Sequence, residues 1–249
     1  MKVSIITVVW NNKKTIKNAI ESVLGQTYNN IEYIIIDGAS IDGTVEIINS
    51  YGSKVSKFLS EPDKGLYDAM NKGLKLATGD IVGILNSDDF YVNDKVIETV
   101  VKAFNEKKVD SVYADLVYVR PDALENVVRH YDSSHFHPDK FAYGWMPAHP
   151  TFFVKREMYE KYGFFKTDYK IAADYELLVR FLKKYKISYY YLNEIIVKMR
   201  TGGVSTSGLK SNYILNKEII RACRENGVST NWIKVLSKYP RKIIGLIQK

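Results

Sequence analysis

The chain has 249 residues and 46% hydrophobic residues, which is ordinary for one large globular α/β domain. No apolar run approaches the roughly twenty residues that a membrane-spanning helix needs, and a single cysteine, Cys223, excludes an internal disulfide. The net charge is +8, but nine basic and two acidic residues between Lys210 and Lys249 account for most of it. This distribution argues against a nucleic-acid surface over the whole domain. Because no signal sequence opens the chain, we expect a cytoplasmic protein.

Strands and helices alternate from the start of the chain. Val3 to Val9 is an almost continuous run of β-branched residues, and a helical pattern of apolar residues follows Trp10-Asn11-Asn12. Ile31 to Ile36 reads as a second buried strand before another helix. This alternation predicts a parallel, Rossmann-like sheet. No GxGxxG pattern follows the first strand, so the main signature of a dinucleotide-binding dehydrogenase is missing.

Acidic residues follow the second strand. Asp37 lies at its carboxyl end, where a carboxylate can accept a hydrogen bond from a nucleobase N–H or can be satisfied by the glycine-rich backbone around it. Asp63 precedes Lys64-Gly65 at the entrance of a helix. It can cap that helix, contact a ligand, or do both.

A third strand ends in paired acids. The apolar run Ile81 to Leu85 follows a helical pattern from Leu66 to Ala77 and stops at Asn86-Ser87-Asp88-Asp89. Asp88 or Asp89 can cap a helix that begins near Asn93-Asp94. Alternatively, the pair can bind a hard cation, because Mg²⁺ and Mn²⁺ prefer carboxylate oxygens and share their remaining positions with substrate phosphates.

The pattern is looser in the second half. Ser111 to Tyr118 predicts the last strand of the first half, and Arg120 to Pro147 predicts loops. Asp174 stands at the beginning of a helix that buries leucines, where it can serve as an N-cap. Glu176 is spaced to pair with Arg180 on the same helix.

Five segments follow one another along the chain: SIITVVWNN, IDGASIDGT, EPDKGLYDAMNKG, NSDD and AADYELLVR. Together and in this order they resemble the family 2 inverting glycosyltransferases of bacterial polysaccharide assembly, those that build colanic acid, capsule and O-antigen. The resemblance covers about the first four-fifths of the chain. It implies the α/β GT-A fold, with a mainly parallel central sheet flanked by helices, a nucleotide-sugar donor and Mn²⁺ or Mg²⁺.

The resemblance also implies roles at the donor site. Asp37 and Asp63 would hold the nucleoside, with uracil as the base. The tip Asn86 to Asp89 aligns with the acidic motif of the family, although Asn86 replaces its first acid and would contact the ribose as an amide. Asp88 is then the leading metal ligand and Asp89 a less favoured one.

On the acceptor side, the resemblance makes Asp174 the general base that accepts the proton of the attacking hydroxyl. Many relatives have a glutamate directly before this acid, whereas this chain has Ala173. His149 matches a pocket position and is a candidate for an acceptor or phosphate contact. Arg200 opens a glycine- and hydroxyl-rich stretch that can lie over the diphosphate or act as a plain linker.

These expectations divide the chain into a glycosyltransferase domain (1–208) and a basic helical tail (209–249). Residues 1–118 form the nucleotide-sugar half and 119–208 the acceptor half. Helical patterns at Ser211 to Glu225 and Asn231 to Ile247 give the tail an apolar and basic character, which suits an anionic membrane with a lipid-linked acceptor. Packing on the domain or a homodimer is the alternative. A sugar nucleotidyltransferase and a nonenzymatic basic binding module remain the other candidate functions.

Overall fold

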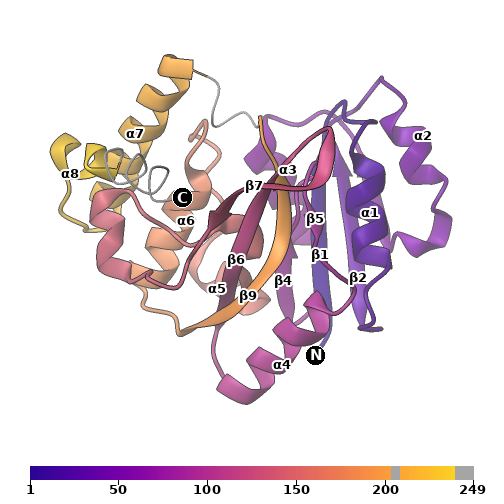
Figure 1. Ribbon diagram of the computed structural model, residues 1–249, viewed down its shortest axis with the longest axis horizontal. Coiled ribbons are helices and arrows are strands. Elements are labelled where there is room, and N and C mark those ends of the chain that lie inside the picture. The colour runs from indigo at the N-terminus through magenta and orange to yellow at the C-terminus, as the bar shows by residue number, and fades with distance from the viewer. Residues whose placement is uncertain (203–207, 239–249) are drawn as a thin grey trace.

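The computed structural model describes residues 1–202 and 208–238 and shows a sheet with helices on both faces (Figure 1). The strand order is β3-β2-β1-β4-β8-β6-β9-β5, and β7 pairs with β6 outside this path. The strands are β1 Val3–Val9, β2 Ile31–Asp37, β3 Lys57–Ser60, β4 Ile81–Ile84, β5 Phe90–Tyr91, β6 Ser111–Arg120, β7 Ala123–Tyr131, β8 Phe153–Lys155 and β9 Tyr189–Arg200.

The first half of the sheet is parallel, as its sequence predicts. Strands β3, β2, β1 and β4 run in one direction, with Val9 opposite Asp37 and Asp37 opposite Ser60. Each parallel pair requires a crossover, which a helix supplies. Because the four strands end at one edge, the loops that follow them come together there.

The two faces of the sheet have separate apolar cores, because successive side chains of a strand point to opposite faces. Ile34 and Ile36 of β2 belong to one core, and Tyr33 and Ile35 to the other. The first core is covered by α3 Leu66–Leu76, α5 Arg156–Tyr162, α6 Ala173–Leu178 and α7 Gly208–Glu225. The second is covered by α1 Ile16–Leu24, α2 Thr44–Asn49 and α4 Val96–Lys107.

The second half of the sheet is mixed. Strand β8 is antiparallel to β4 and β6, whereas β9 runs parallel to β6. The expectation of loops over Arg120 to Pro147 is wrong for its first part, because β7 forms an antiparallel hairpin with β6. Because the middle of β7 is exposed, its sequence has no alternation of apolar and polar residues that would predict a strand. Short 3-10 turns follow at Pro138–Tyr143 and His149–Thr151.

Helix α7 packs on the domain instead of projecting from it (Figure 1). Its apolar residues and those of the following segment join the first core: Ile219, Ile220, Ala222, Cys223, Val228 and Val235. The helix α8 Trp232–Leu236 is shorter than the predicted Asn231 to Ile247, whose end lies outside the described residues. Within the described part of the chain, no helix is long and apolar enough to span a bilayer.

Candidate active site

Asp37 holds together two of the loops at the carboxyl edge of the parallel strands. Its buried carboxylate accepts hydrogen bonds from the Ser40 backbone N–H (2.9 Å), the Ser40 hydroxyl (2.5 Å) and the Ser60 hydroxyl (2.7 Å). Ser40 in turn accepts a hydrogen bond from the N–H of Asn11, in the loop after β1. Three of the roughly four acceptor positions of the carboxylate are therefore occupied by serine donors.

Asp63 lies directly beside this cluster. One oxygen accepts the Gly65 N–H at 2.7 Å, at the entrance of α3, and the other faces Gly38. A Cβ on Gly38 would lie 2.6 Å from Asp63 Oδ2 and 3.3 Å from Trp10 Cδ1, so only glycine allows this approach. Asp63 thus takes part in the helix entrance and still presents its second oxygen at the edge that Asp37 organises.

Trp10 is the aromatic residue that the sequence reading passed over. It follows β1 directly, its ring approaches Gly38, and the residue is 69% exposed. Its position at the carboxyl end of the first strand is the feature of the sequence that could have identified it as a candidate site residue. Its open ring face is suited to stacking on a nucleobase.

The acidic tip follows β4 and contains buried acceptors without donors. Asp89 is fully buried, and its Oδ1 and the Asn86 Oδ1 have no hydrogen-bond partner, although Asn86 Nδ2 donates to Asp89 Oδ2 at 3.3 Å. Burial raises the pKa of Asp89 well above its ordinary value, and the neighbouring Asp88 carboxylate raises it further. Asp88 is only half buried. The tip therefore concentrates oxygen atoms that have unused capacity to accept a cation or a hydroxyl.

Neither carboxylate of the tip caps the next helix. Helix α4 begins at Val96 after Lys95, whose N–H is accepted by Asn93 Oδ1 at 2.9 Å. The capping alternative for Asp88 and Asp89 is therefore wrong.

Arg200 and the loop after β1 hold the tip in place. The buried guanidinium of Arg200 donates one hydrogen bond to the Asp88 carbonyl and another to Asn18 Oδ1 at 2.9 Å. Burial lowers the pKa of Arg200, whereas Asp88 and Asp89 raise it. Arg200 therefore lies at the tip, as the last residue of β9.

Two further contacts to the tip come from the loop after β1. Thr15 Oγ1 donates to the Ser87 carbonyl at 2.8 Å, and Asn12 Nδ2 donates to the Ser87 hydroxyl at 2.9 Å. Sequence reading missed these supports, because each joins residues more than 70 positions apart. They fix the backbone that carries Asp88.

The tip fits a divalent cation held with few protein ligands. Within residues 1–202 and 208–238, no group of three or more His, Cys, Asp or Glu side chains is arranged to hold a metal. Mg²⁺ and similar ions are usually bound through one or two carboxylates, with waters and substrate phosphates completing the shell. Asp88, with the unpaired oxygens of Asn86 and Asp89 beside it, matches that kind of site.

Asp174 forms the second acidic centre. Ala172 is the N-cap of α6, so the capping alternative for Asp174 is wrong; its Oδ1 accepts the Tyr175 N–H at 2.7 Å. Burial raises the pKa of Asp174, and nearby His149 opposes this shift. Burial lowers the pKa of His149, whose ring packs edge-on against Phe165. The structure thus brings together two residues that the sequence singled out separately.

Tyrosines of the β6–β7 hairpin interact electrostatically with both acidic centres. Burial raises the pKa of Tyr118 on β6, and Asp89 adds to this increase. Burial likewise raises the pKa of Tyr131 on β7, with further contributions from Tyr118 and Asp174. Tyr118 and Tyr131 therefore connect the surroundings of the tip with those of Asp174.

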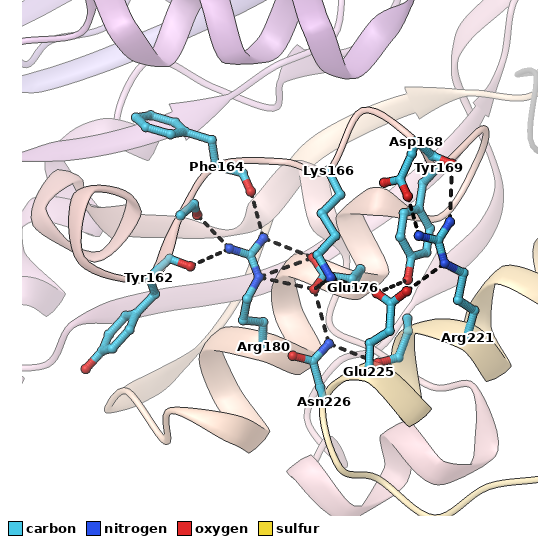
Figure 2. A network of polar contacts seen from close by, with 12 residues as sticks. Tyr162, Phe164, Lys166, Asp168, Tyr169, Glu176, Arg180, Arg221, Glu225 and Asn226 are labelled. Carbon is cyan, nitrogen blue, oxygen red and sulfur yellow. Dashed lines mark hydrogen bonds and ion pairs between the residues drawn. The ribbon is translucent and has the colours of Figure 1, made fainter.

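Glu176 and Arg180 belong to a structural network and not to the reactive centre (Figure 2). Arg180 Nη2 lies 2.9 Å from the fully buried Glu176 carboxylate, and the same guanidinium donates to the carbonyls of Tyr162, Gly163 and Phe164. The pairing expected from the four-residue spacing is confirmed. The network holds the backbone of residues 162–164 against α6 and the turn of helix after it.

The parallel strands with acids at their carboxyl edge, joined to a mixed half with a second, half-buried acid, define the chain as a GT-A glycosyltransferase. It belongs to Glycosyl transferase family 2, whose family model matches residues 4–168. An uncharacterized glycosyltransferase of Rickettsia typhi is 29% identical over 85% of this chain and 68% of its own. An uncharacterized glycosyltransferase of Mycobacterium tuberculosis is 32% identical over 72% of this chain and 68% of the length of that protein.

Solved structures have the same fold at low sequence identity. S. aureus TarS in complex with UDP-GlcNAc superposes with a TM-score of 0.73 and 18% identity, over 92% of this chain and 68% of that one. The mannosyltransferase PcManGT of Pyrobaculum calidifontis, in complex with GDP-Man and Mn²⁺, superposes with a TM-score of 0.65 and 18% identity. The superposition covers 90% of this chain and 63% of that one. The chain spans only 41% of a longer TarS chain.

Proposed function

We propose that the chain is an inverting, metal-dependent glycosyltransferase that moves a sugar from a nucleotide-sugar, UDP-linked, to a hydroxyl of a glycan or lipid-linked oligosaccharide in bacterial surface polysaccharide synthesis. The observation that carries this proposal is the pair of acidic centres: a tip with unpaired buried oxygens, and Asp174 with a raised pKa. Transfer needs one centre for the donor diphosphate and another for the acceptor proton. The UDP and UDP-GlcNAc complexes of TarS support the choice of nucleotide.

The nucleoside would bind at the edge formed by Trp10, Gly38 and Asp63. The exposed Trp10 ring offers a stacking face, and the free oxygen of Asp63 can accept a base or ribose hydrogen. Asp37 already accepts three hydrogen bonds from Ser40 and Ser60, so it would offer a nucleobase N–H its remaining acceptor position, or one that a serine hydroxyl leaves when it turns away. Asn86 would offer its unpaired amide oxygen to the ribose.

Asp88 would be the main ligand of Mn²⁺ or Mg²⁺, with Asp89 as the weaker candidate. The cation supplies positive charge to the leaving diphosphate when it is bound. Arg200 keeps the Asp88 backbone in position and places a second positive charge next to the tip. The Mn²⁺ complex of PcManGT supports this assignment.

Asp174 would act as the general base. The acceptor oxygen forms a bond to the anomeric carbon, the bond from that carbon to the diphosphate oxygen breaks, and the acceptor proton passes to the Asp174 carboxylate. Attack from the side opposite the diphosphate inverts the anomeric centre. The raised pKa makes this carboxylate a stronger base than an exposed aspartate. Buried and largely neutral, His149 can contact the acceptor without competing for its proton.

The acceptor side would work at the cytoplasmic face of a membrane. Stacked Tyr213 and Trp232, with ring centroids 5.7 Å apart, form an exposed apolar patch with Ile233 and Leu236, and Lys234 lies among them. Aromatic and basic side chains of this kind favour the interface of an anionic bilayer, where a lipid-linked acceptor would be presented. A relative in Mycobacterium bovis is named a PGL/p-HBAD biosynthesis glycosyltransferase.

Calorimetry of UDP binding with and without Mn²⁺ tests the donor and metal assignments, with Asp88→Ala and Asp174→Asn compared to the unmodified protein. We expect Mn²⁺-dependent binding that Asp88→Ala loses and Asp174→Asn keeps. UDP-sugar transfer should fall about 10²- to 10⁴-fold in Asp174→Asn, because a positioned base contributes that much to the rate. Substantial transfer by folded Asp174→Asn contradicts the base assignment, and absence of binding to UDP, GDP and dTDP contradicts the proposed function.

A further inference from the structure

Helix α7 holds the backbone directly before Asp174 through one carboxylate. Glu218 Oε1 accepts the N–H of Lys170 at 2.8 Å, and its Oε2 accepts the N–H groups of Ile171 and Ala172, each at 2.9 Å. Hydrogen bonds to a charged acceptor are stronger than those between neutral groups. Three consecutive donors on one carboxylate therefore fix the conformation of this segment.

The segment has a second hold on its other side. The Tyr67 hydroxyl of α3 donates to the Ile171 carbonyl at 2.5 Å, so the peptide groups around Ile171 are fixed from two helices. Ala172 is the N-cap of α6 and has no side chain with which to organise the start of the helix. Glu218, more than 40 positions away in the sequence, instead fixes the three residues that lead into the helix, the last of which is two residues before Asp174.

A separate network joins the same helix to the preceding loop (Figure 2). Glu225 pairs with Lys166 at 2.7 Å and accepts the Tyr169 hydroxyl at 2.9 Å, and Arg221 pairs with Asp168. These contacts end at Tyr169, before the segment that Glu218 binds. Glu225 is therefore a matched control: it is a carboxylate on the same helix that anchors the same loop without touching the backbone of residues 170–174.

Glu218 also acts on Asp174 through its charge. Burial raises the pKa of Asp174, His149 of the 3-10 turn lowers it, and Glu218 of α7 raises it. Two tyrosines interact electrostatically with the same carboxylate, Tyr67 from α3 and Tyr131 from β7, and the pKa values of both are raised by burial and by Asp174. Removal of the Glu218 charge should thus make Asp174 ionise at lower pH.

We propose that Glu218 is a positioning residue for the catalytic base Asp174, and that α7 is part of the catalytic unit and not a detachable tail. This inference rests on the proposed function, since it gives Glu218 a role only through the proton transfer assigned to Asp174. Glutamine in its place keeps a single acceptor oxygen and would bring an NH₂ group toward backbone donors. The segment would then lose part of its fixed geometry.

Hydrogen exchange tests the geometric part without any substrate. The peptide amides of Lys170, Ile171 and Ala172 should exchange at least several-fold faster in Glu218→Gln and Glu218→Ala than in the unmodified protein, and at the unmodified rate in Glu225→Gln. Carbon-13 NMR of the aspartate carboxyl groups should show the Asp174 titration moved to lower pH in Glu218→Gln alone. Unchanged exchange at these amides or an unchanged titration overturns the inference.

Kinetics tests the catalytic part. With a UDP-sugar that the unmodified protein turns over, kcat should fall about 10²-fold in Glu218→Gln, because small displacements of a catalytic group have effects of that size. The Kd of UDP with Mn²⁺ should stay within about twofold, and the acidic limb of the kcat profile should move to lower pH. Glu218→Asp should recover part of the rate.

The outcomes separate the two claims. One outcome is that Asp174→Asn loses transfer while Glu218→Gln and Glu218→Ala keep full kcat. This result leaves the proposed function in place and overturns only the positioning role. Equal losses in Glu218→Gln and Glu225→Gln also overturn it, because they would show a general effect of loosening α7. Full transfer in Asp174→Asn contradicts the base assignment itself.

Discussion

At the scale of single residues, the site depends on side chains that the fold leaves incompletely used. Asp89 Oδ1 and Asn86 Oδ1 are buried without donors, and one oxygen of Asp63 faces Gly38. Unpaired buried acceptors cost free energy, so their persistence points to a ligand that satisfies them. Trp10 is an apolar side chain that the fold also leaves without full burial, since the residue is 69% exposed beside the same edge.

Replacement of Trp10 tests whether this ring binds the nucleotide. Trp10→Ala should weaken UDP binding by about 1–3 kcal/mol, the usual contribution of stacking between a base and an aromatic ring. Trp10→Phe should keep most of the affinity. Because the ring is mostly exposed, both variants should unfold at nearly the unmodified temperature, which thermal denaturation will check. Equal UDP affinity of Trp10→Ala and the unmodified protein in calorimetry would exclude stacking on this residue.

Residue patterns predicted the acids but not their supports. Asp37, Asp63, Asp88 and Asp174 were candidates because each follows a strand or stands near the start of a helix, which are local features of the sequence, and the family resemblance supplied their proposed roles. Glu218 could not be found in this way, because its contacts join α7 to a loop 46 to 48 positions away. The hydrogen bonds of Asp37 to Ser40 and Ser60 were equally invisible, since serines near an acid have many possible partners.

At the scale of elements, a buried carboxylate joins the strands at the edge opposite the site. Glu32 of β2 accepts the Ser4 hydroxyl at 2.6 Å, the Thr78 N–H at 2.7 Å and the Lys2 ammonium at 3.0 Å, and it also pairs with Lys57. Burial alone would raise the pKa of Glu32, but the hydrogen bonds from Ser4 and Thr78 outweigh it and hold the pKa far below its ordinary value. Glu32 thereby connects β1, β2 and the turn before β4.

Glu32→Gln should lower the free energy of unfolding at pH 7 by about 3 kcal/mol, because it removes one member of a buried charged network. Since the pKa of Glu32 is depressed in the folded state, its contribution is complete above the unfolded value of about 4.5 and is lost as the pH falls toward the folded value. The difference between variant and unmodified protein should therefore shrink from pH 7 to pH 3 in urea unfolding. The exposed Glu46→Gln is the control. A difference that is constant with pH would contradict this account.

Elements with a buried apolar run or an apolar helical face agree closely with their predicted limits, whereas the exposed strand β7 does not. Strand β1 has the predicted limits, and helix α3 ends one residue before Ala77. Strand β7 was missed because hydrogen bonds to β6 define it while its side chains lie largely in solvent. The predicted Asp88 or Asp89 cap failed for a related reason: sequence shows which residues can cap a helix but not where the chain turns.

At the scale of the whole molecule, the two halves share a continuous sheet, and the segment after residue 208 completes one of its cores. The boundary predicted at residue 208 followed a real change in charge and composition, but charge describes the surface of α7 and not its packing. Exposed Lys217 and Arg224 lie on the same helix as buried Ile219, Ile220 and Cys223. A helix with one basic and one apolar face fits packing on the domain as well as it fits a membrane.

Two truncated chains distinguish a structural α7 from a dispensable tail. Residues 1–208 lack Ile219, Ile220, Val228 and Val235, and burial of such side chains is worth roughly 1.5–3 kcal/mol each, which together approaches the whole stability of a domain. We expect this chain to lose its cooperative thermal transition and to expose apolar surface. Residues 1–238 keep these side chains and should unfold near the temperature of the full chain.

The chain of residues 1–238 also tests membrane association. The full chain and residues 1–238 are compared by co-sedimentation with vesicles of phosphatidylcholine and phosphatidylglycerol. Because residues 239–249 include Arg241, Lys242 and Lys249, their removal takes positive charge from the chain and should weaken its binding to the anionic vesicles. A cooperative transition of residues 1–208 at the temperature of the full chain would show that α7 is dispensable for the fold.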